Sequence, residues 1–148
     1  SDIIPPQYIS DQSVIERCII GDGAEIYGEV RNCVIGSGVT IGQGTVVRDS
    51  IIMKDVEIGS GCIIDKAIIA EDVKIGANVT LGTGGEAPNK MKPDIYSFGL
   101  VTIGENSVIP DGVQIGKNTA VSGVTIREDY PNGILESGET LIKAGERV

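Results

Sequence analysis

The chain has 148 residues and a net charge of −9, from 21 acidic and 12 basic residues, which disfavours a broad nucleic-acid footprint or binding to an anionic membrane. No stretch approaches the roughly 18 apolar residues of a membrane span, and three cysteines without a CxxC pair indicate free thiols in a reducing cytoplasm. Hydrophobic residues make up 41% of the chain, with one Phe, four Tyr, no Trp and 21 Gly, a composition typical of short strands and tight turns.

The first segment, residues 1–13, has the sequence SDIIPPQYISDQS and contains a Pro-Pro pair but no repeat. Proline favours an extended backbone and cannot donate a backbone hydrogen bond. We therefore expect residues 1–13 to be a linker that lays one strand on the structure that follows.

An aliphatic repeat follows the linker. In the stretch IGSGVTIGQGTVV at residues 35–47, aliphatic residues recur every six positions, and a step of five then leads to the next group. The larger period is therefore 17, except for a first coil of 15 residues between Ile20 and Ile35. The columns are Ile35, Ile52 and Ile69; Ile41, Ile58 and Ile75; and Val47, Ile64 and Leu81, and the repeat returns at Ile103, Ile109, Ile115 and Val121.

Three aliphatic columns predict a three-sided solenoid in which each side is a short strand and each corner is a tight turn. Helices are excluded, because glycine at every sixth position would break them. We predict an all-β fold, a parallel β-helix over residues 14–126 with coils of about 17 residues stacked about 4.8 Å apart. The repeat resembles the hexapeptide repeat of left-handed β-helices, and this resemblance implies a left-handed prism.

Two segments fall outside the repeat. Residues 82–99, GTGGEAPNKMKPDIYSFG, interrupt the prism and predict a loop that protrudes from one corner. Residues 127–148 lose the repeat and predict a tail or a cap, because the end of a solenoid otherwise exposes unpaired strand edges.

The residue types limit the chemistry of the prism. The chain contains no His, which disfavours acyl transfer with a His base and also a zinc site with three His ligands. A carboxylate base keeps a hexapeptide-class acyltransferase as one alternative, and a purely structural scaffold is another. Cys18 and Cys33 share a column with Ser50 and Ala67, so a position for small side chains is favoured over a nucleophile.

One edge of the predicted prism carries several cations. Two adjacent columns contain, in order, Arg17, Asn32, Asp49 and Lys66, and Glu16, Arg31, Arg48 and Asp65. One interpretation is an edge of weak ion pairs that compensate one another. The other is a site for a phosphorylated small molecule, because Arg and Lys side chains bind phosphate.

Three segments, in their order along the chain, carry a family resemblance. They are PPQYI at 5–9, VRDSIIMKDVEIGSGCIIDKAIIAEDVKIGANV at 47–79, and KPDIYSFGLVTIGENSVIPDGVQIG at 92–116. Together they resemble the C-terminal left-handed β-helix domain of bacterial glucose-1-phosphate adenylyltransferase. The resemblance implies a parent enzyme that makes ADP-glucose and pyrophosphate from ATP and glucose 1-phosphate in glycogen biosynthesis. It also implies that catalysis and Mg²⁺ belong to an N-terminal domain absent from this chain.

For these residues themselves the resemblance implies a non-catalytic role in regulation and in assembly of a homo-oligomer, a tetramer in the family. The implied partners are the parent catalytic domain and an effector such as fructose 1,6-bisphosphate, AMP or phosphate. The position before AII (67–69) is linked to effector binding in the family, and here it is Lys66. Arg48 and Arg31 are secondary candidates from their columns. No metal or cofactor is expected in this chain, and the expected location is the cytoplasm.

Overall fold

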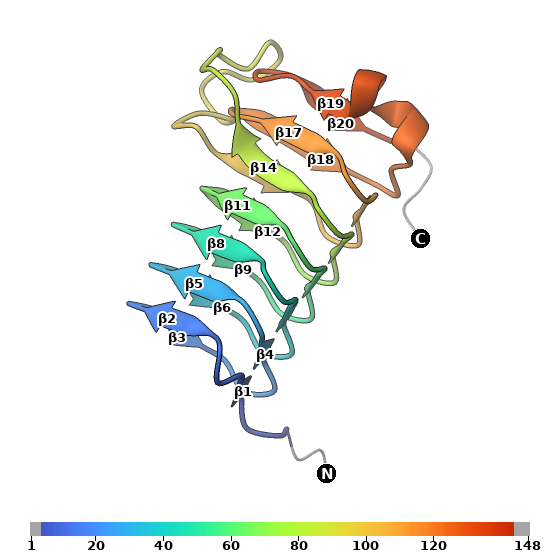
Figure 1. Cartoon of the computed structure of the whole chain (residues 1–148). Coiled ribbons are helices and arrows are strands. Elements are labelled where there is room, and N and C mark those ends of the chain that lie inside the picture. The colour runs from blue at the N-terminus through green and yellow to red at the C-terminus, as the bar shows by residue number, and fades with distance from the viewer. Residues whose placement is uncertain (1–3, 144–148) are drawn as a thin grey trace.

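The computed structural model describes residues 4–143, which wind into a three-sided prism of stacked coils (Figure 1). The strands form three parallel sheets, in which each strand pairs with strands of the coils below and above it. The fold is therefore an all-β parallel β-helix, which confirms the architecture predicted from the aliphatic repeat. Its left hand is the one that the family resemblance implies.

The three faces are named sheets A, B and C, and the end nearer the N-terminus is the lower end. Sheet A contains β1 (Tyr8–Ile9), β4 (Glu25–Ile26), β7 (Thr40–Ile41), β10 (Glu57–Ile58), β13 (Lys74–Ile75) and β16 (Val108–Ile109). Sheet B contains β2 (Val14–Glu16), β5 (Glu29–Arg31), β8 (Val46–Arg48), β11 (Ile63–Asp65), β14 (Thr80–Thr83), β17 (Gln114–Gly116) and β19 (Ile134–Leu135). Sheet C contains β3 (Ile19–Ile20), β6 (Val34–Ile35), β9 (Ile51–Ile52), β12 (Ala67–Ile69), β15 (Val101–Ile103), β18 (Thr119–Ser122) and β20 (Thr140–Ile142). Two short 3-10 helices, η1 (Arg127–Asp129) and η2 (Pro131–Gly133), lie between β18 and β19.

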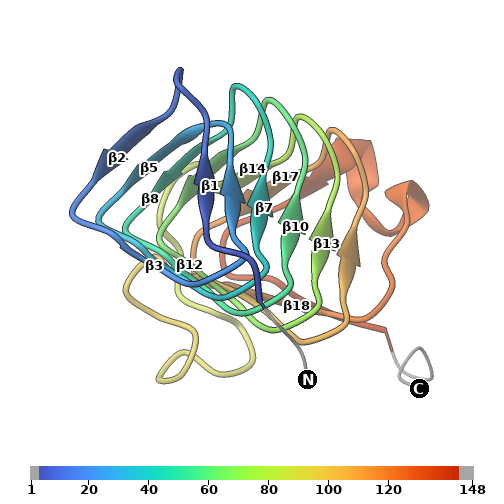
Figure 2. The same cartoon turned by 90° about the horizontal axis from the view of Figure 1, so that it is seen from below.

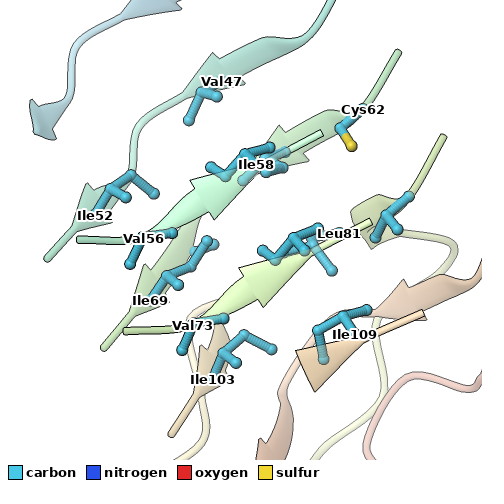
Figure 3. Close-up of a cluster of buried hydrophobic side chains, with 14 of the residues drawn as sticks. Val47, Ile52, Val56, Ile58, Cys62, Ile69, Val73, Leu81, Ile103 and Ile109 are labelled. Atoms are coloured by element: carbon cyan, nitrogen blue, oxygen red, sulfur yellow. The ribbon is translucent and has the colours of Figure 1, made fainter. Parts of the chain in front are cut away.

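The core consists of inward side chains that stack from coil to coil. Ile58, for example, pairs with Ile41 below and Ile75 above, and Figure 3 shows such side chains from all three faces pointing toward one another. The columns are Ile26, Ile41, Ile58, Ile75 and Ile109 in sheet A, Val30, Val47, Ile64, Leu81 and Ile115 in sheet B, and Ile35, Ile52, Ile69, Ile103 and Val121 in sheet C, none more than 4% exposed. The interior is thus filled by aliphatic side chains, in keeping with the scarcity of aromatic residues.

The first complete coil is shorter because one corner is shorter. Ile26 and Val30 are four positions apart, whereas Ile41 and Val47, one coil higher, are six apart. Gly28 occupies the shortened corner, where an added Cβ would overlap the backbone of the coil above. The missing two residues therefore explain the coil of 15 residues.

The chain makes one further turn above β18 and covers the upper end of the prism. β19 pairs with β17, which places Leu135 over Ile115, and β20 pairs with β18, which places Leu141 over Val121. η1 and η2 take the place of a strand on the sheet A side, and the buried Tyr130 between them joins the core. The upper coil is therefore covered by the chain itself.

The two isoleucines of β11 allow a direct test of the inward column. Ile64 is fully buried and its neighbour Ile63 is 48% exposed. Ile64→Ala should lower the free energy of unfolding by about 2–5 kcal/mol, because it removes buried surface and leaves a cavity. Ile63→Ala is the matched control and should cost at most about 1 kcal/mol. Equal losses in urea unfolding would contradict the buried column.

The corner glycines allow a second test. A Cβ added at Gly59 would lie 2.7 Å from the carbonyl oxygen of Gly76 in the coil above. Gly59→Ala should therefore lower the free energy of unfolding by about 1–3 kcal/mol, since the two coils must separate. A Cβ at Gly85 would meet no described atom within 4 Å, so Gly85→Ala should change the stability by less than about 0.5 kcal/mol. A tolerated Gly59→Ala would show that the coils are not closely packed at this corner.

Candidate functional site

The corner between sheets B and C repeatedly uses a left-handed backbone. The φ angle is +48° at Arg17, +55° at Asn32, +52° at Asp49, +55° at Lys66 and +57° at Asn118. Asn and Asp adopt this conformation readily, whereas it strains longer side chains by about 1 kcal/mol or more. Arg17 and Lys66 are therefore basic residues at positions that local backbone preference does not favour.

The loop formed by residues 84–99 projects from the prism near β12 (Figure 2). Lys66 directly precedes β12 in the chain. The Cδ atoms of Lys66 and Lys117 lie 3.8 and 4.0 Å from the position that a Cβ would take on Gly99. Oε1 of Glu86 lies 3.7 Å from the same position. Two lysines and one carboxylate thus surround a backbone position that has no side chain of its own.

Two buried asparagines hold this loop against the prism. Oδ1 of Asn118 accepts a hydrogen bond from the Gly99 amide at 2.8 Å, and its Nδ2 donates to the carbonyl of Ala87 at 2.9 Å. Asn89 donates to the carbonyl of Asn118 at 2.9 Å and accepts from the amide of Met91 at 2.9 Å. Because buried amides with satisfied hydrogen bonds fix a unique geometry, Gly99 is held between the two lysines.

The two arginine candidates differ in their partners. Nη1 of Arg31 lies 2.6 Å from Oε1 of Glu16, and Nη2 lies 3.8 Å from Oε2 of Glu29. The hydrogen bond to Glu16 raises the pKa of Arg31, which is thus held in place by carboxylates. Arg48 lies between Arg31 and Asp65 in the register of sheet B and is exposed. Within residues 4–143, neither Arg48 nor Lys66 forms an ion pair.

The column analysis misses Lys117. The step from Ile115 to Val121 is six residues, whereas the step from Ile64 to Ile69 is five, so this corner contains one extra residue. The pairing of β14 with β17 also shifts register just before the corner. The longer step is the sequence signal that identifies a distinct corner here. That Lys117 lies close to Lys66, however, depends on the loop between these two residues.

The cysteines are packed in the prism. Cys33 and Cys62 are buried, and burial raises the pKa of Cys33 to about 11 and also raises the pKa of Cys62. Such thiols stay protonated at neutral pH and are poor nucleophiles. In the described part of the chain, no three His, Cys, Asp or Glu side chains are grouped as metal ligands. The same residues include no helix with the length and apolar character needed to cross a membrane.

Known proteins resemble this chain over nearly its whole length. The family model described as GlmU-like, C-terminal hexapeptide, matches residues 5–103. Relatives named glucose-1-phosphate adenylyltransferase are 63% identical in Lachnospira eligens, 55% in Thermotoga maritima and 41% in Acetivibrio thermocellus, over 99%, 94% and 96% of this chain. The chain spans only about a third of these relatives, at 34%, 33% and 33% of their lengths.

A solved structure shares the fold. The acetyltransferase domain of PglB from Neisseria gonorrhoeae FA1090, in complex with acetyl coenzyme A, has a TM-score of 0.54 and covers 97% of this chain and 58% of that chain. At 13% identity, this likeness shows the fold alone. Because the family model matches more than half of the chain, the protein belongs to the family of GlmU-like C-terminal hexapeptide domains.

Proposed function

We propose that this chain is the non-catalytic regulatory and oligomerisation domain of a glucose-1-phosphate adenylyltransferase. The observation that carries the proposal is the 63% identity, along 99% of the chain, to a relative of that name of which the chain spans 34%. The conversion of ATP and glucose 1-phosphate to ADP-glucose and pyrophosphate then belongs to the remainder of a cytoplasmic enzyme. The Mg²⁺ ion of that reaction belongs there as well.

The effector site of this proposal is formed by Lys66 and Lys117 around Gly99, with the Glu86 carboxylate at the same point and Arg48 beside it on sheet B. Ammonium groups bind phosphate oxygens as compact charges, and an arginine adds a planar fork of donors. A phosphorylated metabolite such as fructose 1,6-bisphosphate, AMP or phosphate therefore suits this cluster. Arg31 contributes less, because Glu16 already holds its guanidinium.

Regulation would operate through the stiffness of the prism. Three continuous ladders of backbone pairing leave the β-helix few soft degrees of freedom, so it would move as a rigid body against a catalytic domain. An effector that bridges Lys66 to cations on that domain would favour one docking geometry over another. The difference in effector-binding free energy between the two docking geometries is the coupling free energy between the effector site and catalysis.

Lys66→Asn in the full enzyme tests the site without disturbing the corner. Asn32 and Asn118 occupy the same column with the same left-handed backbone, so the stability should stay equal or rise by up to about 1 kcal/mol. The ratio of activated to unactivated turnover should fall about tenfold, because a charged phosphate contact is worth about 1.5–3 kcal/mol. Arg31→Gln is the control and should change this ratio much less. Equal effects of both variants on effector titrations would contradict the site.

A thermal-shift panel on the isolated chain separates this function from acyl transfer. A ligand that binds only the folded state raises the melting temperature, by an amount that grows with its concentration over its Kd. We expect a rise with fructose 1,6-bisphosphate, AMP or phosphate, and a smaller rise in a Lys66→Asn, Lys117→Gln double variant. A rise with acetyl coenzyme A alone would contradict the proposal and favour a hexapeptide-class acyltransferase.

A further inference from the structure

The outward side of sheet C carries a continuous apolar column in its lower four coils. Ile19, Val34, Ile51 and Ile68 pair in succession from β3 to β12. The first three are 72%, 46% and 44% exposed. The equivalent outward column of sheet A contains Glu25, Thr40, Glu57 and Lys74. Sheet C is therefore apolar at the positions where sheet A is polar and charged, and such a patch on a folded domain marks an interaction surface.

Charged residues border this apolar column on both sides. At the corner with sheet B, from the lowest coil upward, the border residues are Arg17, Asn32, Asp49 and Lys66. At the corner with sheet A, in the same coils, they are Asp22, Ser37, Lys54 and Glu71. The first border is positive, neutral, negative and positive. The second is negative, neutral, positive and negative, with Asp55 and Asp72 as the next residues in the upper two coils. Within the chain, Nζ of Lys54 lies 4.0 Å from Oε2 of Glu71. The two borders thus have opposite signs at each charged position of these columns.

A second copy of this chain matches that pattern. A two-fold axis parallel to the prism axis brings two sheet C faces together and sets each coil opposite the same coil of the other copy. The border with sheet B of one copy then faces the border with sheet A of the other copy. The opposed pairs are then Arg17 with Asp22, Asn32 with Ser37, Asp49 with Lys54, and Lys66 with Glu71. Each pair occurs twice, and all the charged pairs have opposite signs.

The alternative two-fold arrangement is disfavoured. An axis perpendicular to the prism axis reverses the order of the coils and sets each border against the same border of the other copy. Arg17 then lies opposite Lys66, and like charges across an interface oppose association. The charges therefore select parallel prisms.

The shape of the face agrees with this choice. A hollow of about 380 Å³ runs along the border with sheet B, and its lining includes Arg17, Asn32, Asp49, Ile19, Val34 and Ile51. The opposite border of a second copy would place its side chains in this hollow. Above the fourth coil the column continues with Thr102 and Ala120, so the apolar part ends near the coil from which the loop projects (Figure 2).

We propose that two copies of this chain associate through sheet C with their prism axes parallel. Burial of the apolar column provides the driving force, and the charged borders set the orientation. This inference names the surface for the assembly role proposed above and rests on that role. Lys66 belongs to both proposals, but the experiments below change Ile51, Arg17 and Asp22 and use no effector, so the two can fail separately.

The first experiment measures the dissociation constant of the whole 148-residue chain by sedimentation equilibrium, for the wild type and two matched variants. Ile51→Lys places a charge at the centre of the face and should weaken the dimer by about 30-fold or more. Ile63→Lys changes an isoleucine of similar exposure on sheet B and should leave the constant within about threefold. A wild-type chain that stays monomeric at about 100 μM, or equal weakening by both variants, would overturn the inference.

The second experiment tests the orientation by exchanging one charged pair. Asp49 already has a left-handed backbone in the same column as Arg17, so Arg17→Asp is compatible with the corner. Arg17→Asp or Asp22→Arg alone should weaken the dimer about tenfold, because two attractive contacts become repulsive. The double variant should return to within about threefold of the wild type. Additive weakening in the double variant would exclude parallel prisms. Lys66 stays intact throughout, so these results are independent of the effector titrations.

Discussion

The backbone ladder between successive coils is the constraint on which the rest of this prism depends. Each strand takes its hydrogen bonds from the coil below and the coil above, so the coils can neither separate nor slide without breaking a row of bonds. Parallel strands lie about 4.8 Å apart, and this spacing brings equivalent residues of successive coils into contact. Aliphatic side chains therefore stack in the interior, and glycine is required wherever a corner such as Gly59 touches the backbone above it.

The same ladder places each outward side chain in a column of equivalent positions. The three faces of the prism therefore differ in the type of side chain that their outward columns carry. Sheet A is polar and charged, the lower coils of sheet C are apolar, and the corner between sheets B and C carries the cations. None of these outward residues is needed for the interior. Outward columns can therefore vary while the fold stays the same, which is compatible with the proposed role in regulation and assembly for a solenoid that shares its fold with an acetyltransferase domain.

The cationic corner combines two features of the fold. Lys66 has a left-handed backbone at a position of the column where other coils have Asn32, Asp49 and Asn118. Lys117 reaches the same place because the loop between them returns to the prism at Gly99 and is fastened there by Asn118. The lysines thus lie close together although they are 51 positions apart in the sequence. The loop that interrupts the regular repeat thus brings together two lysines that the repeat alone would not place side by side.

The sequence by itself determined the three-sided β-helix, its coil length and the place of its loop, because a coil of 17 residues repeats the same local environment and so selects the same residue types. It indicated Lys66, Arg48 and Arg31 as neighbours for the same reason. Only the tertiary structure decided that Glu16 holds Arg31, that Lys117 approaches Lys66, and that Leu135 and Leu141 continue the core after two short helices. These features depend on contacts between residues far apart in the chain and on irregular steps at the corners, and periodicity carries no information about either.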